Sequence, residues 1–125
     1  RGEQVQVAGV TDPAGSMFAP DHRPQLSAAR GEGRGDVALR VLLAHQPSCA
    51  PAAADLGFDL QLSGHTHGGQ FFPHTLLVHL AQRYVAGLYS VQAMKLFVHR
   101  GTTWWGPPMR LGSRHEIVQL ELVPG

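Results

Sequence analysis

The sequence lacks the features that mark a disulfide-stabilised, nucleic-acid-binding or membrane-spanning chain. Cys49 is its single cysteine, which excludes an internal disulfide framework. Charged residues make up only 15% and the formal net charge is +1, with the ten basic residues scattered along the chain. No basic stripe of the kind that binds nucleic acid is therefore present. No apolar run approaches the roughly 18 residues of a membrane helix, so any membrane anchor is expected N-terminal to this sequence.

The sequence does contain a strand–helix–strand pattern. Of the 125 residues, 43% are apolar, enough for the core of one domain or part of one. Residues 38–44 form an apolar run of strand length, and residues 58–63 alternate with period 2. Between them, Ser48 is a suitable N-cap, alanines follow, and Gly57 is a suitable helix stop. Such a crossover makes the two strands parallel, with their carboxyl ends at one sheet edge, where α/β proteins bind ligands.

Three histidines follow these two strands. His45 ends the first strand, and His65 and His67 lie in the glycine-rich segment 64–70 after the second. Gly64, Gly68 and Gly69 are expected to allow positive φ and a tight loop. An isolated His-x-His is also compatible with a polar surface loop, but His45 on a parallel strand favours a metal site. The two strands would lie about 5 Å apart, or about twice that if one strand lies between them. Histidines at their ends could therefore bind a pair of metal ions roughly 3.5–4 Å apart.

Four segments together carry a family resemblance. They are LLAHQP at 42–47, LQLSGHTHGGQ at 60–70, GPPMRLG at 106–112 and VAGVTDP at 7–13. The chain resembles the C-terminal half of a calcineurin-like metallophosphoesterase, in the bacterial branch whose catalytic domain commonly follows N-terminal membrane helices. The resemblance implies part of an α/β fold, a four-layer α-β-β-α sandwich in which two sheets pack face to face, with residues 1–125 as a partial domain.

The resemblance also implies a set of metal ligands. His45 and His65 would bind one ion and His67 the other, with no catalytic residue beyond these ligands. The cofactors would be two divalent or trivalent ions, and imidazole with carboxylate suits manganese, zinc and iron alike. The family's remaining ligands come from D-x-H, G-D-x-x-D and G-N-H-[DE] motifs, none of which occurs in this sequence. We therefore interpret the chain as a fragment and expect residues 1–125 alone to be inactive.

The implied function is hydrolysis of a phosphate ester or pyrophosphate. The substrate would be a phosphorylated small molecule or lipid, and the full-length protein would be membrane-associated through its N-terminal segment. Arg100 and Arg110 are candidates for phosphate binding, although Arg100 could equally pair with a carboxylate. Asp12, after the first strand, is a weaker candidate than the histidines. Two alternatives are a non-catalytic interaction module on the same fold and a mononuclear zinc-binding domain.

The remaining patterns predict elements around this sheet. Residues 14–36 are expected to form a long exposed loop with at most one helical turn, most flexible at 31–35. A short amphipathic helix is expected at 75–82, two strands at 84–89 and 95–99, and a last strand at 115–123 with one buried face.

Two further groups of residues are interpreted as structural. We expect Trp104 and Trp105 to form an aromatic plug against the following prolines, with a pocket wall or a membrane-interface contact as alternatives. Four other histidines are interpreted as surface or capping residues: His22, His74, His79 and His115.

Overall fold

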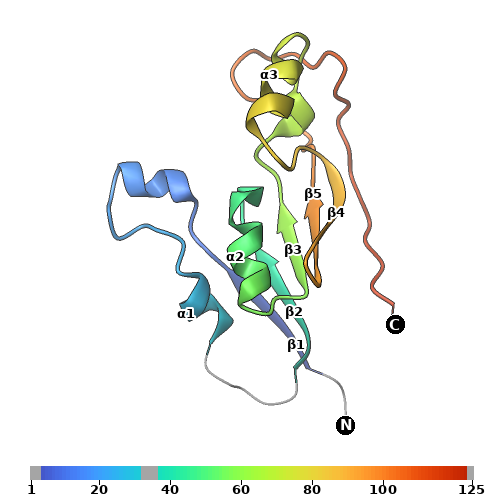
Figure 1. Cartoon of the computed structure of the whole chain (residues 1–125). Coiled ribbons are helices and arrows are strands. Elements are labelled where there is room, and N and C mark those ends of the chain that lie inside the picture. Colours follow the sequence, from blue (N-terminus) through green and yellow to red (C-terminus); the bar gives the residue numbers. More distant parts are fainter. Residues whose placement is uncertain (1–3, 32–36, 124–125) are drawn as a thin grey trace.

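The computed structural model describes residues 4–31 and 37–123 (Figure 1). It contains five strands: β1 (Gln4–Gly9), β2 (Val37–Leu43), β3 (Leu60–Ser63), β4 (Gly87–Val91) and β5 (Met94–Val98). Three α-helices accompany them: α1 (Leu26–Arg30), α2 (Ala50–Asp55) and α3 (His74–Ala81). Short 3₁₀ helices occupy Pro13–Met17, Pro47–Cys49 and His67–Gly69.

The strands form one sheet in the order β1-β2-β3-β5-β4. β1, β2, β3 and β5 are parallel, and β4 pairs antiparallel with β5. β2 and β3 are direct neighbours joined through α2, which confirms the predicted strand–helix–strand unit. Their carboxyl ends, and that of β1, meet at one edge of the sheet, which is where the histidines follow.

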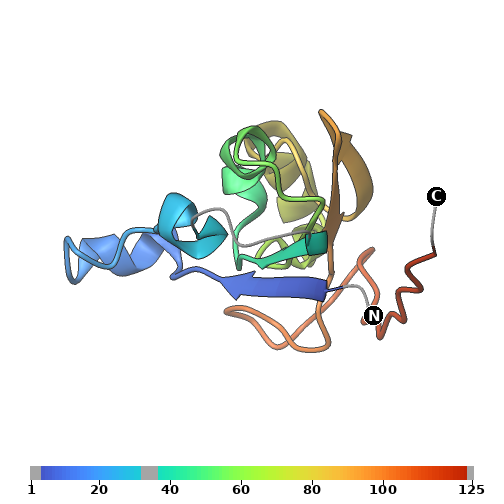
Figure 2. The same cartoon turned by 90° about the horizontal axis from the view of Figure 1, so that it is seen from below.

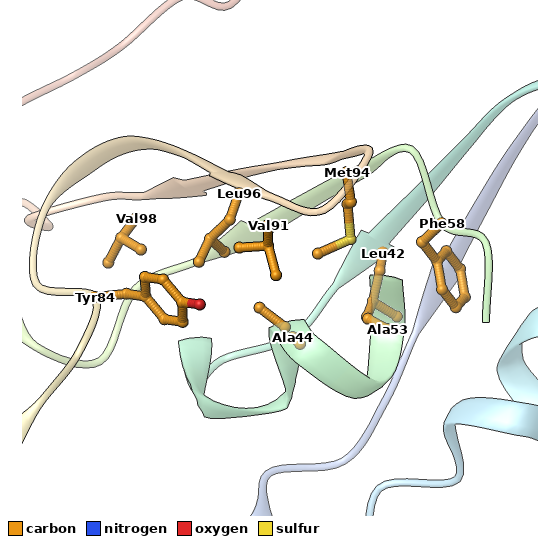
Figure 3. Close-up of a cluster of buried hydrophobic side chains, with 10 residues drawn as sticks. Leu42, Ala44, Ala53, Phe58, Tyr84, Val91, Met94, Leu96 and Val98 are labelled. Atoms are coloured by element: carbon orange, nitrogen blue, oxygen red, sulfur yellow. The ribbon is translucent and has the colours of Figure 1, made fainter. Parts of the chain in front are cut away.

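The core lies between the sheet and α2. Leu42, Leu96 and Val98 are fully buried there against Ala50 and Ala53 of the helix (Figure 3). The small alanine side chains allow the helix to approach the sheet closely. Figure 2 shows that α1 lies on the same side of the sheet as α2. This face is therefore a closed hydrophobic layer.

The start of α2 differs from the prediction. Ser48 does not cap it: a 3₁₀ turn at Pro47–Cys49 leads into the helix, and no side chain caps the first helical residues. The proline fixes a tighter turn than an ordinary α-helix start, because its ring sets φ and leaves no backbone donor. The predicted stop is confirmed, since Gly57 follows the helix with φ of 74°.

The opposite face of the sheet is also apolar. Strand register places one set of side chains on it: Val5, Val7, Leu39, Val41, Leu43, Leu60, Leu62, Leu88 and Phe97. Val7 is 62% exposed and Leu88 65%. Within the described residues, no helix packs on this face, and residues 120–122 only border a cavity of about 220 Å³ there. Leu43 is 45% exposed on this face, whereas Leu42 and Val98 point into the core on the other side.

The predicted strand at 115–123 is wrong. The segment is extended but joins no sheet, and Ile117 is 93% exposed. Its backbone contact with the rest of the described chain is a hydrogen bond from Glu116 N to Gly101 O, 3.3 Å. Alternation of apolar residues predicts a strand only where a neighbouring strand accepts the ladder. In the described residues, neither edge of the sheet pairs with it.

The other predicted elements are confirmed with shifts. The two late strands form a hairpin, β4 and β5, that turns at Gln92 and lies a few residues from the predicted bounds. The loop after β1 contains two short helices instead of one turn, and most of its glycine-rich stretch falls outside the described residues. α3 is present, but Leu76, Leu77 and Leu80 are exposed. Among the described residues, no helix has the length and apolarity to cross a bilayer.

Candidate metal centre

Two of the predicted ligands meet at the carboxyl edge of the sheet. His45 Nε2 lies 3.3 Å from His65 Nδ1, and the two rings meet edge-on. Asp12 joins them, with Oδ2 3.8 Å from His45 Nε2. One ligand atom from each of the three residues lies within 4.8 Å of the others. Three adjacent parallel strands thus each deliver one metal-binding side chain just beyond their ends, the position where α/β sheets commonly bind ligands.

Asp12 is held in place by its own hydrogen bonds. Its Oδ1 accepts from Ala14 N at 2.7 Å and from Gln46 Nε2 at 2.9 Å. Gln46 directly follows His45, so the same loop that carries a histidine also fixes the carboxylate. The sequence makes Asp12 a weaker candidate than the histidines, whereas the structure groups it with His45 and His65. Its position after β1 was visible, but its contact with Gln46 depends on the pairing of β1 with β2.

The histidine loop is strained. His65, His67 and Gln70 have φ of 71°, 51° and 55°, and they are three of the four non-glycine residues with positive φ in the described chain. Such conformations are costly for residues with a Cβ and tend to gather at functional sites. Gly64 does not adopt the positive φ that was predicted, because His65 takes that conformation instead.

Gly68 and Gly69 are needed for close approach. Both have positive φ, as predicted. A Cβ on Gly68 would lie 2.7 Å from Ser113 Oγ, and one on Gly69 would lie 2.8 Å from Thr75 Cα. The loop therefore packs its backbone directly against α3 and the segment near Ser113.

Partial desolvation lowers the pKa of both loop histidines. Desolvation lowers the pKa of His65, and the nearby His45 lowers it further. Desolvation also lowers the pKa of His67, followed by the positive charge of Arg110. A lowered pKa leaves the imidazole unprotonated at neutral pH. Because only an unprotonated ring nitrogen binds a metal ion, both shifts favour metal binding.

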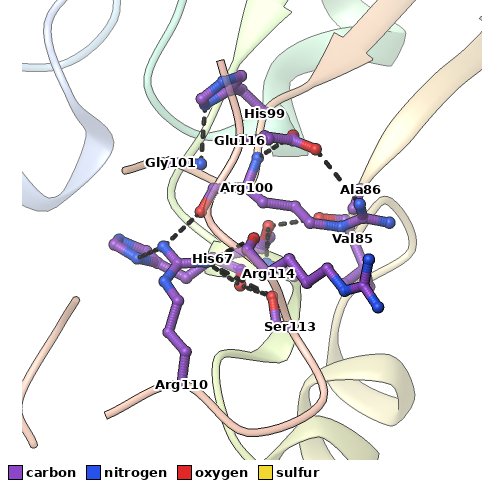
Figure 4. Close-up of polar contacts among 12 residues, drawn as sticks. His67, Val85, Ala86, His99, Arg100, Gly101, Arg110, Ser113, Arg114 and Glu116 are labelled. Carbon is purple, nitrogen blue, oxygen red and sulfur yellow. Dashed lines mark hydrogen bonds and ion pairs between the residues drawn. The ribbon is translucent and has the colours of Figure 1, made fainter. Parts of the chain in front are cut away.

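His67 faces a different partner. Its Nδ1 lies 3.0 Å from Arg110 Nη2 (Figure 4). A guanidinium only donates, so Nδ1 accepts and the neutral ring carries its proton on Nε2. The carbonyl of His67 accepts from Ser113 Oγ at 2.7 Å. His67 lines the same pocket as His45 and His65, but it does not belong to the three-ligand group with Asp12.

The two candidate arginines hold the C-terminal loop. Arg110 donates to the carbonyls of Arg100 at 2.7 Å and Thr103 at 2.8 Å, in addition to its contact with His67. Arg100 pairs with Glu116 at 3.2 Å, which is the carboxylate pairing that the sequence left open. Neither arginine lines the pocket that contains the histidines.

That pocket has a volume of about 400 Å³. Besides the three histidines it is lined by Thr66, Gln70, Phe71, His74, Val78, Gln82 and Trp105. His74, interpreted as a surface or capping residue, and Gln70 were not predicted to lie there. Trp104 and Trp105 are more than half exposed, so the buried aromatic plug is wrong. Trp105 lines the pocket, which is the pocket-wall alternative that the sequence left open, whereas Trp104 does not line it.

The donor set fits a metal ion. Ligand nitrogens about 2.05 Å from a tetrahedral zinc lie about 3.3 Å apart, close to the observed separation of His45 Nε2 and His65 Nδ1, 3.3 Å. Two neutral imidazoles with a carboxylate are donors that zinc, iron and manganese all accept.

Sequence comparisons identify the family. The chain is 40% identical over 125 residues to an uncharacterized metallophosphoesterase of Campylobacter jejuni, covering 94% of this chain and 31% of that protein. It is 42% identical over 122 residues to a transmembrane protein with metallophosphoesterase domain of Bos taurus, covering 94% of this chain and 27% of that protein. Over 89 residues it is 38% identical to the phosphodiesterase YaeI of Escherichia coli, covering 67% of this chain and 32% of that protein. No family model and no solved structure matches.

The chain belongs to the metallophosphoesterases, which confirms the resemblance carried by its motifs. It spans less than a third of the length of these three relatives.

Proposed function

We propose that the full-length protein hydrolyses a phosphate ester or pyrophosphate with two metal ions, and that this chain supplies His45, His65 and His67 as ligands. The 3.3 Å approach of His45 Nε2 to His65 Nδ1 is the observation that carries the proposal. The relatives' names, metallophosphoesterase and phosphodiesterase, support the reaction class. When bound, the ions would lower the pKa of water and neutralise charge on the phosphoryl oxygens.

The chain's own residues hold and orient this centre. The β2–α2–β3 core fixes the two strand ends, so His45 and His65 approach each other without a flexible linker. Asp12, fixed by Gln46 and Ala14, adds a carboxylate on the same side. Arg110 Nη2 lies 3.0 Å from His67 Nδ1, so the guanidinium stands beside a proposed ligand, which supports its candidacy for phosphate binding. Arg100, whose carbonyl accepts from Arg110, is the second candidate.

The face of the sheet opposite α2, which is only partly covered, supports the sandwich architecture. Nine apolar side chains from all five strands share that face, and no helix among the described residues covers them. An apolar sheet face of this size is stable in water only when another layer packs on it. We propose that a second sheet from the full-length protein packs there. Membrane association of that protein is part of the same proposal and is supported by the name of the bovine relative. We further propose a phosphorylated small molecule or lipid as the substrate.

A mononuclear site is the second candidate. The group of Asp12, His45 and His65 has three ligands without His67, as a single catalytic zinc ion requires. Metal content separates the two: we expect two ions per full-length chain, and one ion that survives His67→Ala would favour the mononuclear site.

The activity test uses the full-length protein with manganese or zinc and p-nitrophenyl phosphate esters. We expect metal-dependent turnover that His65→Ala abolishes. His79→Ala is the matched control, because His79 is exposed on α3 and does not line the pocket. Equal turnover in the two variants would contradict the proposed role of His65.

A further inference from the structure

The metal-centre pocket continues into an apolar wall. Phe71, Val78 and Trp105 line it together with the histidines. The ring of Phe71 stacks on His74 at 5.2 Å, which presents a flat aromatic layer from the start of α3. The residues lining this pocket in the described chain include no lysine, arginine, aspartate or glutamate. Beyond the metal ligands, the pocket therefore offers apolar contact and a few neutral polar groups.

Trp105 is held at the pocket by the side chain of Gln70. Gln70 Nε2 donates to Trp105 O at 2.6 Å, and Gln70 Oε1 accepts from Trp105 N at 2.6 Å. The amide thus pairs with both backbone groups of the tryptophan, as a neighbouring strand would. Gln70 is only 3% exposed, and its own backbone accepts from Leu111 N at 3.0 Å. The loop carrying Trp105 is consequently fixed to the histidine loop at two points.

The conformation of Gln70 indicates that this arrangement has a cost. Gln70 has φ of 55°, in the region that residues with a Cβ avoid. Trp105 remains 68% exposed, although burying an indole would stabilise the fold. A strained residue that holds an exposed tryptophan beside a pocket is better explained by ligand binding than by stability.

We infer that Trp105, Phe71 and Val78 bind a hydrocarbon group on the phosphate ester, and that Trp105 determines specificity for it. This inference rests on the proposed function, because it places the phosphate at His45 and His65. The substrate class is then an ester whose phosphate carries an alkyl chain. A nucleotide or sugar ester would call for charged or multiple hydrogen-bonding partners along the wall. Gln70 is a positioning residue that acts through Trp105.

The test varies only the retained group of the ester. The full-length protein, loaded with manganese, is assayed with methyl p-nitrophenyl phosphate and octyl p-nitrophenyl phosphate, which share one leaving group. We expect a higher kcat/KM for the octyl ester. Trp105→Ala should lower the octyl-to-methyl ratio of kcat/KM roughly tenfold, within the range for apolar pocket contacts, while Trp105→Phe retains most of it. Leu80→Ser is the control, since Leu80 is exposed on α3 and lies outside the pocket.

A double-mutant comparison tests the role of Gln70. Gln70→Leu should reduce the same ratio, and the double variant with Trp105→Ala should lose no more than Trp105→Ala alone, because both changes remove one interaction. A merely structural role would instead lower turnover of both esters equally. Additive loss in the ratio would contradict positioning through Trp105.

A binding measurement separates this inference from the proposed function. Calorimetry compares octyl phosphate with methyl phosphate on the metal-loaded protein and on its Trp105→Ala variant. If neither ester is hydrolysed but octyl phosphate binds at least tenfold more tightly in a Trp105-dependent way, the proposed function fails and the inference stands. Metal-dependent hydrolysis with an octyl-to-methyl ratio unchanged by Trp105→Ala overturns the inference alone. If the protein shows neither turnover nor a preference for octyl phosphate, the proposed function and the inference about Trp105 are both overturned.

Discussion

The two faces of the sheet differ in what completes them. The face toward α2 is closed by residues of this chain, with Leu42, Leu96 and Val98 inaccessible to solvent. The other face is largely apolar but only partly covered: Val41 and Leu60 on it are buried, whereas Val7 and Leu88 remain exposed. The candidate metal centre lies at the strand ends between these faces. The closed face thus fixes the position of the centre. We propose that the remaining metal ligands come from the part of the full-length protein that packs on the open face.

The largest expected effect is on activity. Residues 1–125 alone should show no measurable phosphomonoesterase or phosphodiesterase turnover, while the full-length protein turns over. The reason is that this sequence lacks the D-x-H, G-D-x-x-D and G-N-H-[DE] motifs, which supply the family's bridging carboxylate and other ligands. A chromogenic diester assay with manganese checks this. Turnover by residues 1–125 that disappears in His65→Ala would contradict this prediction, because it would show that the ligands in this chain are sufficient for activity.

A pair of core truncations compares the faces directly. Leu96→Ala on the closed face should lower the free energy of unfolding of the full-length protein by about 2–5 kcal/mol, as buried leucine truncations do. Val7→Ala on the open face should cost about 1 kcal/mol or more only if a second layer buries Val7, and much less if it stays exposed. Urea titrations of both variants measure this. A negligible effect of Val7→Ala would contradict the sandwich.

The next prediction concerns pH and metal. The pKa values of His65 and His67 are lowered in the folded protein, so the unfolded chain takes up protons first as pH falls below the ordinary value near 6.5. Stability should therefore be greatest above that pH and decline below it. Bound zinc or manganese should raise the Tm at pH 7.5 and lose this effect in the same range, because protonated imidazole does not bind metal. Thermal melts from pH 8 to 5 test this, and a pH-independent metal effect would contradict it.

The smallest expected effect is at the surface ion pair beyond the centre. Glu116→Gln removes the charge that pairs with Arg100 at 3.2 Å. Because both side chains are partly exposed, the loss should be about 0–1 kcal/mol in the free energy of unfolding. The affinity of the variant for inorganic phosphate then tests the role of Arg100. Tighter binding would indicate that Arg100 can contact the substrate phosphate, whereas unchanged affinity would favour a purely structural ion pair.

The sequence predicted the closed face well because its signals are local. The period of residues 58–63, the alanines of α2 and the stop at Gly57 each act within a few residues, and they place His45 and His65 at adjacent strand ends. The contacts of Asp12 with Gln46 and of Gln70 with Trp105 join segments more than 30 residues apart, and no local pattern indicates them. The predicted strand at 115–123 failed for the same reason, since pairing depends on a distant neighbour.

The position of β1 has a consequence for how the metal centre assembles. Among the residues that the structure describes, β1 is an edge strand that pairs with β2 alone, and Asp12 lies just beyond its end. Because a strand at a sheet edge is expected to open locally more readily than central strands, we expect Asp12 to join the group after β2 and β3 have brought the two histidines together. A bound ion would in turn slow the fraying of β1. Hydrogen exchange at its amides would then report metal occupancy from one end of the sheet.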